Sequence, residues 1–538
     1  MREIIECVPN FSEGRDRTVI DAIAEAIRGT PGCTLLDVDA GASTNRTVYT
    51  FVGGKEAVVE GALRAARVAR ARIDMRQHQG EHPRLGALDV CPFVPVSGVT
   101  MEDCVECARA FGRRAAQELG VPIFFYEGAA TAPHRRALKD IRAGEYEGLA
   151  EKLKKPEWAP DCGPAKLVPE WGATVTGARD FLIAYNVNVL GTKEQAHRIA
   201  LNVREQGRGP KEPGRLPKVK GIGWWVEEYG LAQVSMNLDD FRVTPPHVAY
   251  EACIEEAREL KVAVVGSELV GLIPRDALLM AADHFIQKEG LFVLDEPAKV
   301  RLAAERLGLG SVSPFVPEKR VIEYMLAPES DEKLLRLSVR DFVEELGSRS
   351  PAPGGGSAAA VIAAMGAALG VMVGWLTYGK RKFEAQDPVM RRLLPPLHAA
   401  MKGLLPLVDA DTRAFDAYMG ALGLPKATAE ETTERRRVVQ EALRRAVEVP
   451  LQVMRVADAA WEAMAEMAVH GNPASRSDLE VGARALELGI WGAHRNVLVN
   501  LGEVEDELFR RRAAAEAEAL VARAREKVAA VLTASEKR

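Results

Sequence analysis

The order of secondary-structure patterns changes once along the chain, and this change limits the possible folds more than any single motif does. Strand and helix patterns alternate up to about residue 326, whereas helical periodicity dominates from residue 336 onward, with no convincing strand. A charged, proline-containing stretch at 327–335 separates the two parts. A chain of 538 residues should divide into about three domains, at roughly 150 residues each. We therefore expect a linker at 327–335 and an all-α antiparallel helix bundle at 336–538.

The alternating part divides into two similar halves, 1–179 and 180–326. The second half has the β-α-β-β-α-β order of a ferredoxin-like sandwich. Its expected elements are strand 181–190, helix 193–206, strand pair 220–238, helix 247–261 and strand 262–274. The first half begins in the same order and adds one helix and one strand, whereas 130–167 is predicted as a polar connection. Two adjacent α/β sandwich subdomains favour a ligand cleft between them, because pockets form preferentially at domain interfaces.

Composition narrows the class of protein. The formal net charge of -5 argues against a nucleic-acid-binding protein, which usually carries a basic excess. Seven scattered cysteines, an odd number, fit a reducing compartment better than a disulfide framework, so we expect a cytoplasmic protein. The uncharged stretch 357–378 is long enough to span a bilayer. Its high Ala and Gly content and the amphipathic helices around it favour a buried central helix over an integral membrane segment.

His82 is the first candidate for catalysis. It lies in GEHPRLGALDV (80–90), where Gly80 and Pro83 exclude a regular helix and predict a rigid loop before a strand. An imidazole titrates near neutral pH and can therefore take up a proton in one step and return it in the next. The alternative is a surface histidine without a role. His78 invites a zinc site, but the interrupted backbone prevents the helix that would align the two imidazoles, so no metal is expected.

Charged side chains near this loop are supporting candidates. Asp37 and Asp39 have strand spacing and point to one side of the sheet. At the strand end, Asp39 can orient an imidazole, bind a cationic amidine, or simply form a turn. Arg46 and Arg84 can meet substrate carboxylates or be solvated.

A Gly- and Pro-rich stretch at the end of the first half, GPAKLVPEWGATVTGARDF (163–181), is typical of a preformed loop lining a cleft. Within it, Trp171 is a possible wall for a flat ring and Lys166 a possible cation; the alternative is an interdomain linker. The candidate binding residues of this stretch are its first ten: Gly163, Pro164, Ala165, Lys166, Leu167, Val168, Pro169, Glu170, Trp171 and Gly172.

Two motifs of the helical part can carry chemistry. SPAPGGGSAAA (350–360) places Ser357 at a helix start, where free N–H groups can receive an anion or a serine can simply cap a turn. LVDADTRAF (407–415) contains Asp409 and Asp411, which point about 200° apart on a helix, so at most one faces a central pocket. Asp411 shares its face with Phe415, which favours Asp411.

Long blocks of the chain, in order, resemble the formimidoyltransferase-cyclodeaminase family. The resemblance covers nearly the whole chain and both fold types. Its blocks include ECVPNFSEG (6–14), LLDVDAGASTNRTVYTFVG (35–53), GEHPRLGALDVCPF (80–93), SPAPGGGSAAA (350–360), LVDADTRAF (407–415) and RSDLEVGARALE (476–487).

The resemblance implies two reactions. The two α/β subdomains would transfer the formimino group of N-formimino-L-glutamate to N5 of tetrahydrofolate. The helical domain would cyclise 5-formiminotetrahydrofolate to 5,10-methenyltetrahydrofolate and release ammonia. It implies His82 as the transferase base and acid, 163–172 as a folate-contacting loop, and Asp411 as the cyclodeaminase catalyst. On this basis Asp39 is a candidate to hold the imidazolium, and Lys166, Arg46 and Arg84 are candidates for the basic walls that the substrate carboxylates need.

The resemblance also implies partners and assembly. Polyglutamylated tetrahydrofolate would be a substrate and carrier, with no metal or nucleic acid. Family members form a homo-octamer, a tetramer of dimers that channels folate between sites, in the cytoplasm, with peripheral Golgi or cytoskeletal association in animal relatives. Two alternatives remain open: a monofunctional formiminotransferase whose helical domain serves oligomerisation, and a folate-binding or trafficking scaffold.

Overall fold

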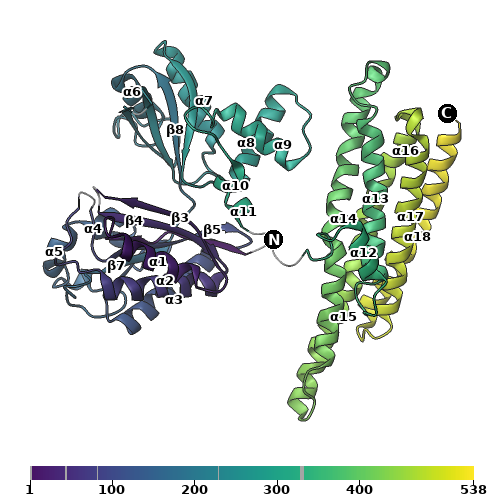
Figure 1. Cartoon of the computed structure of the whole chain (residues 1–538), viewed down its shortest axis with the longest axis horizontal. Helices are drawn as coiled ribbons and strands as arrows, with labels where there is room; N and C mark the ends of the chain where they lie inside the picture. Colours follow the sequence, from purple (N-terminus) through teal and green to yellow (C-terminus); the bar gives the residue numbers. More distant parts are fainter. Residues whose placement is uncertain (1–2, 43–44, 81–82, 228, 327–331, 538) are drawn as a thin grey trace. The chain divides into compact units, whose positions relative to one another are not determined.

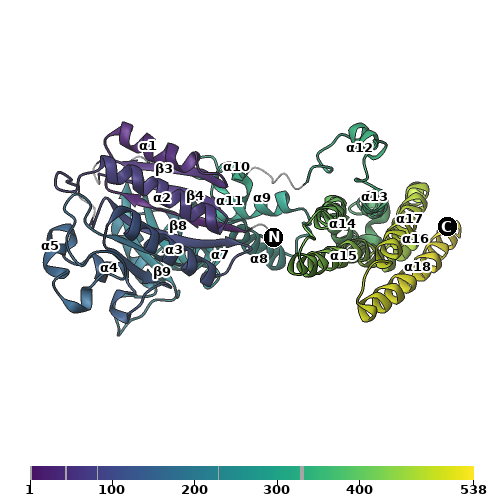
Figure 2. The ribbon, with the colours of Figure 1, turned by 90° about the horizontal axis from the view of Figure 1, so that it is seen from below.

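The computed structural model describes residues 3–42, 45–80, 83–227, 229–326 and 332–537. The chain divides into two compact units, Met1–Ala327 and Pro328–Arg538, drawn in Figure 1 and, turned by 90°, in Figure 2. The first unit contains sheets and helices, whereas the described part of the second contains helices and turns without a strand. This arrangement confirms the predicted fold class.

The first unit begins with a seven-stranded sheet. Strands β5, β1, β4 and β3 lie in the ferredoxin-like order, and β7 and β6 extend the β5 edge in parallel. Helices α1, α2 and α3 cover one face of this sheet (Figure 1). The elements are β1 (Ile4–Cys7), β2 (Asn10–Phe11), α1 (Arg17–Arg28), β3 (Cys33–Gly41), β4 (Arg46–Gly53), α2 (Lys55–Arg72), β5 (Leu88–Ser97), α3 (Met101–Leu119), β6 (Ile123–Glu127) and β7 (Thr174–Ala178).

Alternation along the strands gives this sheet one apolar face and one mixed face. Phe11, Tyr49 and Phe51 are buried in the core beneath α1 to α3. On the opposite face, Ile4 and Val52 belong to the same apolar cluster as the second subdomain, which joins the two halves. This opposite face is therefore the one turned toward the second subdomain (Figure 1).

Strand β7 was not predicted, because its sequence, TVTGA, resembles a loop. In the structure it lies between β5 and β6 and is completely buried. Its hydroxyls are satisfied by β5: Thr174 Oγ1 donates to Leu88 O (2.7 Å) and Thr176 Oγ1 to Cys91 O (2.8 Å). The interpretation of these residues as part of a loop was therefore wrong, and the reason is a long-range pairing that satisfies buried threonines.

The connection predicted at 130–167 contains two short helices, α4 (Leu138–Arg142) and α5 (Glu145–Lys152), along with two 3-10 turns, Pro133–Arg135 and Pro156–Trp158. These helices supply charged side chains to the candidate site.

The second subdomain is a four-stranded antiparallel sheet in the order β11-β8-β10-β9, the ferredoxin-like topology. Helices α6 and α7 pack against it, and alternate residues of β8, including Tyr185 and Val187, are buried in their shared core. The elements are β8 (Ile183–Leu190), α6 (Lys193–Val203), β9 (Val219–Val226), β10 (Leu231–Leu238), α7 (Pro246–Glu259), β11 (Ala263–Val270), α8 (Arg275–Glu289), α9 (Glu296–Leu307), α10 (Pro317–Arg320) and α11 (Ile322–Met325).

The second unit is a helix bundle, in which α13 packs most extensively against α14 and α17. Glycines allow the close approach of α17: a Cβ on Gly366 would lie 2.7 Å from Gly482 O. The helices are α12 (Val339–Leu346), α13 (Gly355–Trp375), α14 (Asp387–Leu422), α15 (Ala429–Asp458), α16 (Trp461–His470), α17 (Arg476–Leu501) and α18 (Glu507–Glu536).

Helix α13 is long and apolar enough to cross a membrane, yet 61% of its most apolar window is buried inside the bundle. That burial is typical of the core helix of a bundle.

The chain entering the bundle is bound to it through Asp409. This carboxylate is buried and accepts the backbone N–H groups of Leu334 (2.8 Å) and Leu335 (3.2 Å). The C-terminal end of the predicted linker is thus held by α14.

This contact predicts different stabilities for two fragments of the helical unit. Both 328–538 and 336–538 should be helical by far-UV circular dichroism, but the shorter fragment leaves a buried carboxylate without these donors. An unsatisfied buried group costs about 1–3 kcal/mol, and each kcal/mol lowers Tm by about 2–4 °C in a domain of this size. Equal Tm values would contradict the role of Asp409, and a strand-rich spectrum would contradict the bundle.

Candidate functional site

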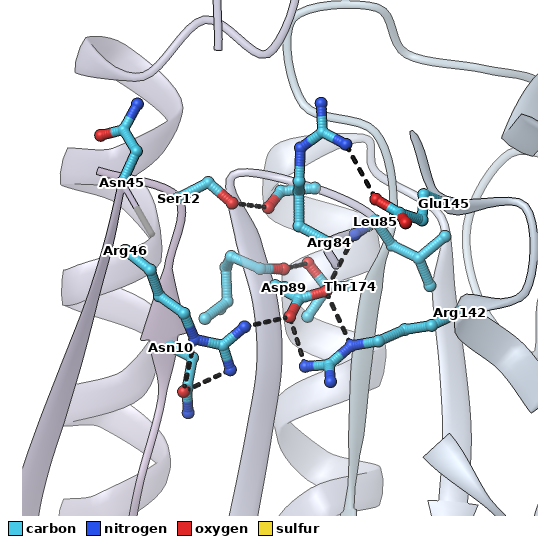
Figure 3. A network of polar contacts seen from close by, with 12 residues as sticks. Asn10, Ser12, Asn45, Arg46, Arg84, Leu85, Asp89, Arg142, Glu145 and Thr174 are labelled. Carbon is cyan, nitrogen blue, oxygen red and sulfur yellow. Dashed lines mark hydrogen bonds and ion pairs between the residues drawn. The ribbon is translucent and has the colours of Figure 1, made fainter. Parts of the chain in front are cut away.

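Three of the sequence blocks meet at one end of the first sheet, as Figure 3 shows. Ser12 Oγ donates to Gly86 O (2.8 Å), and the backbone N–H of Gly14 donates to Asn45 Oδ1 (3.0 Å). Asn45 Nδ2 in turn donates to Gln79 O (2.9 Å). Gly14 is required by this approach, because a Cβ there would lie 2.3 Å from Gly41 O. The blocks at 6–14, 35–53 and 80–93 therefore form a single polar cluster.

His82 itself lies outside the described residues, as does Glu81. The chain on both sides of them is held in place. Before the gap, Gln79 O accepts from Asn45; after it, Arg84 O accepts the N–H of Tyr146 (2.9 Å) and Leu85 N–H donates to Asp89 Oδ1 (2.9 Å). The two ends of the segment that carries His82 are thus fixed to the cluster.

Asp89 is the buried centre of this cluster. Its carboxylate binds Arg46 (3.0 Å) and also Arg142 of α4, and Arg46 Nε donates to Asn10 Oδ1 (3.0 Å). Burial lowers the pKa of Arg46 to about 10, and the neighbouring Asp89 opposes that shift. Arg46 is therefore not a solvated cation: the chain's own Asp89 and Asn10 hold it on the sheet face.

Arg84 is likewise engaged by the chain. It is buried and binds Glu147 (2.6 Å) and Glu145 (3.2 Å) of α5, and its Nε donates to His78 Nδ1 (3.3 Å). Burial lowers the pKa of His78, and the charge of Arg84 lowers it further. A carbonyl oxygen only accepts and a guanidinium only donates, so His78 Nε2–H donates to Asn45 O (2.8 Å) and its Nδ1 accepts from Arg84. Sequence analysis missed Glu145, Glu147 and Arg142, because their helices are short and polar.

The other charged candidates are exposed. Asp39 and Asp37 lie on the edge strand β3, exposed on the same side, after a register shift at Leu35–Asp37. Lys166 is exposed. Their predicted roles remain predictions.

The predicted folate loop, 163–172, ends beside the histidine loop. Gly172 has a φ of +79°, and a Cβ there would lie 2.0 Å from Leu85 O. Ala87 N–H donates to Trp171 O (2.8 Å) and Ala173 N–H to Leu85 O (3.1 Å). The two predicted loops are therefore joined three residues after His82.

Trp171 does not line a cleft, so its interpretation as a wall for a flat ring was wrong. Its side chain is 1% exposed, lies in the core beneath the helices, and donates through Nε1 to Thr174 Oγ1 (3.0 Å). The β7 pairing draws it into the interior.

A buried amide array lies on the second sheet, on the face opposite α6 and α7. Gln233 Nε2 donates to Asn188 Oδ1 (2.8 Å) and Glu268 Oε2 (3.0 Å), and Gln233 Oε1 accepts from Trp224 (3.1 Å) and Asn186 (3.3 Å). Sequence analysis missed this array. Its signal was present in IAYNVNVL, where two asparagines at strand spacing interrupt an apolar strand.

Glu268 is the charged member of the array. It accepts hydrogen bonds from Tyr229 (3.0 Å), Gln233 and Asn186 (3.2 Å), all neutral donors. Among the residues that the structure describes, no cation pairs with Glu268. The carboxylate is therefore held in place by neutral groups while its charge stays available to a cationic ligand.

The bundle contains a cavity of about 300 Å³ between α13, α14, α15 and α17. Asp411 lines it with Phe415 and Tyr418 of the same helix, whereas Asp409 points to the entering chain. Ser357, at the start of α13, donates to Asp411 Oδ2 (3.2 Å). The N-terminal end of α13, where the sequence allowed an anion to bind, thus contacts the carboxylate of Asp411.

The environment of Asp411 suits an acid. Burial raises the pKa of Asp411, and the side-chain and backbone donors of Ser357 partly oppose that rise. The carboxylate packs directly on glycine, since a Cβ at Gly356 would lie 2.1 Å from Oδ1. In the described part of the chain, no group of three or more His, Cys, Asp or Glu side chains is placed to hold a metal ion.

The chain matches three family models: "Formiminotransferase domain, N-terminal subdomain" at 4–179, "Formiminotransferase domain" at 184–327 and "Formiminotransferase-cyclodeaminase" at 338–519. It is 59% identical over 534 residues to the formimidoyltransferase-cyclodeaminase of Dictyostelium discoideum, covering 99% of this chain and 98% of that protein. The protein of that name from Rattus norvegicus is 58% identical over the whole of both chains. The glutamate formimidoyltransferase of Streptococcus pyogenes serotype M1 is 43% identical over 290 residues, 54% of this chain and 95% of that protein.

Proposed function

The chain belongs to the formimidoyltransferase-cyclodeaminase family, and from that premise we propose how its two units divide two reactions on one folate molecule. The α/β unit transfers the formimino group from N-formimino-L-glutamate to N5 of tetrahydrofolate. The helical unit cyclises 5-formiminotetrahydrofolate to 5,10-methenyltetrahydrofolate and releases ammonia. The observation that carries this division is Asp411: a half-buried carboxylate with a raised pKa, in a cavity that the bundle forms by itself.

An absorbance assay tests the proposal directly. Formiminoglutamate and tetrahydrofolate are supplied as the only reactants, and the methenyl product is followed by its absorbance. The intact chain should form this product without a second enzyme. If only 5-formiminotetrahydrofolate accumulated, the chain would be a monofunctional transferase, which is one of the alternatives left open by the sequence.

For the transfer step, we place His82 at the reacting nitrogens. N5 of tetrahydrofolate attacks the formimino carbon and loses its proton to the imidazole. The bond from that carbon to the glutamate nitrogen then breaks, and the imidazole returns the proton to the departing nitrogen. Fixed loop ends on both sides of 81–82 support this role, because a base must be held within hydrogen-bond reach of the proton it moves.

For substrate recognition in the transferase, we place Glu268 against the formimino group. This group is an amidine and is cationic at neutral pH. A carboxylate can accept two parallel N–H bonds from an amidinium, as it does from a guanidinium. Glu268 fits because its neutral donors orient it without neutralising it.

This assignment predicts a selective effect of Glu268→Gln. The variant should lower kcat/KM for formiminoglutamate by about 10- to 100-fold, the equivalent of one charge-assisted hydrogen bond. Inhibition by the neutral isostere N-formyl-L-glutamate should change little, because it carries no cation. Glu227→Gln, at an exposed turn of the same subdomain, is the matched control. Equal losses for the amidine and its isostere would refute an ionic role.

For the cyclisation, we place Asp411 at the departing amine. N10 attacks the formimino carbon, the bond from that carbon to the terminal nitrogen breaks, and Asp411 donates the proton with which ammonia leaves. The proton that N10 loses as the methenyl bridge forms restores the acid form of Asp411. Burial raises the pKa of Asp411, which favours the protonated form that this task needs.

We extend the proposal to assembly and compartment. The folate is polyglutamylated, the chains form a homo-octamer built from dimers, and folate passes between sites without release. All seven cysteines are free, which supports a cytoplasmic location. Native mass spectrometry of the full chain tests the octamer.

A further inference from the structure

One wall of the bundle cavity carries three polar side chains from the C-terminal part of α17 and the turn that follows it. Asn496, Asn500 and Glu503 all line the cavity. Asn496 and Asn500 are spaced i and i+4 and therefore lie on one face of α17, whereas Glu503 lies in the turn just after the helix ends at Leu501. The structure therefore presents three polar side chains along the cavity.

Hydrogen bonds elsewhere determine which atoms these side chains offer. Asn496 Nδ2 donates to Gly492 O (2.9 Å) and Asn500 Nδ2 to Ala446 O (2.7 Å). A carbonyl oxygen only accepts, so each amide must turn its NH₂ group toward it. Neither Oδ1 accepts a hydrogen bond from any residue that the structure describes. Both oxygens are thus left as acceptors.

Glu503 is the third acceptor. Its Oε2 accepts from Tyr418 of α14 (2.5 Å), so the carboxylate is oriented while Oε1 stays available. Glu503 forms no ion pair with any described residue, and the charge of this wall is negative.

Residues of α13 and α14 line the cavity opposite these three side chains. Gly355 approaches Asn496, since a Cβ there would lie 3.5 Å from Asn496 Nδ2, and the adjacent Gly356 packs on Asp411. Tyr418, seven residues after Asp411 on α14, donates to Glu503 in the turn after α17. The cavity therefore has Asp411 near Asn496 at one end and Glu503 at the other, with Phe415 between them on the α14 side.

A reduced pterin matches this pattern of acceptors. Along one edge it carries three N–H donors, at N3, at the 2-amino group and at N8, with the ring nitrogen N1 among them. N3–H and the 2-amino group are neighbours at the pyrimidine end and form a pair that one carboxylate can accept. The reacting N5 lies on the opposite edge. A cavity of about 300 Å³ is at the lower limit for ligand pockets and suits one ring system.

We propose that Glu503 binds the 2-amino and N3–H end of the pterin, with Asn500 and Asn496 accepting further along the same edge. Phe415 then contacts the ring, and the N5 edge is turned toward Asp411. This inference rests on the proposed cyclisation in the bundle, and it makes Glu503, Asn500 and Asn496 specificity-determining residues.

The test combines a variant with a changed ligand. In the intact chain, Glu503→Gln should lower kcat/KM for supplied 5-formiminotetrahydrofolate by about 10- to 100-fold, mainly through KM, and leave formimino transfer unchanged. Glu505→Gln, which removes an exposed partner of Arg436 two residues away, is the matched control and should have no effect on cyclisation.

Binding of 5-formyltetrahydrofolate and of its analogue lacking the 2-amino group separates recognition from a structural role. The parent chain should bind the 2-desamino analogue at least about 10-fold more weakly, whereas Glu503→Gln should hardly distinguish the two. If the ratio of the two ligands' affinities were the same in the parent chain and in the variant, the inference would be overturned. Equal binding of both ligands by the parent chain would also overturn it, and that measurement does not depend on the folding of a variant. A parent chain that does not cyclise at all would instead refute the proposed function.

Discussion

Replacing His82 with alanine should abolish formimino transfer and leave cyclisation unchanged. We expect transfer to fall by about 10²- to 10⁴-fold, because one imidazole moves a proton in both halves of that reaction. Cyclisation of supplied 5-formiminotetrahydrofolate should proceed at the parent rate, because Asp411 and its cavity belong to a separate compact unit. Both rates can be measured in the same preparation by the absorbance of the methenyl product.

His134→Ala provides the control for His82. This imidazole is exposed and lies in the same α/β unit, where Nε2 contacts Glu157 O (2.9 Å). Its removal should leave both reactions intact. Transfer at the parent rate in His82→Ala would show that the base lies elsewhere, and loss of both activities would contradict the division between the two units.

Asp411→Asn should have the opposite effect and cause 5-formiminotetrahydrofolate to accumulate. The substitution keeps the shape of the side chain and removes its acid, so cyclisation should fall by about 10²- to 10⁴-fold while transfer continues. The pH profile follows with a definite sign. Burial raises the pKa of Asp411, and the protonated form is the donor, so kcat for cyclisation should fall as pH rises through that raised pKa. The variant should lose this descending limb.

Asp409→Asn is the matched control, two residues away on the same helix. Asp409 is buried and binds Leu334 and Leu335 rather than the cavity. We expect a loss of about 1–3 kcal/mol in the free energy of unfolding, measured in urea, with cyclisation retained. If Asp409→Asn accumulated the intermediate and Asp411→Asn did not, the assignment of Asp411 would be wrong.

The sequence alone identifies some of the side chains on which these predictions depend, but not others. Gly80 and Pro83 predict a loop around residue 82, and the helix phase separates Asp409 from Asp411. By contrast, Glu268 and Glu503 stand in ordinary polar contexts. Only the pairing of β8 with β10 and β11 brings Glu268 to its partners, and only the fold of the bundle brings Tyr418 of α14 to Glu503.

The sequence by itself determined the order of elements, the change from α/β to all-α near residue 330, and the blocks that carry the family resemblance. Periodicity decides these features, because burial of one face of a strand or helix depends on near neighbours in the chain. Tertiary structure alone decided the fate of particular side chains. It buried Trp171, inserted β7, paired Arg84 with Glu147, and tied Asp409 to the entering chain. The physical reason is that a buried polar group takes whichever partner the fold brings to it, and that partner is distant in the sequence.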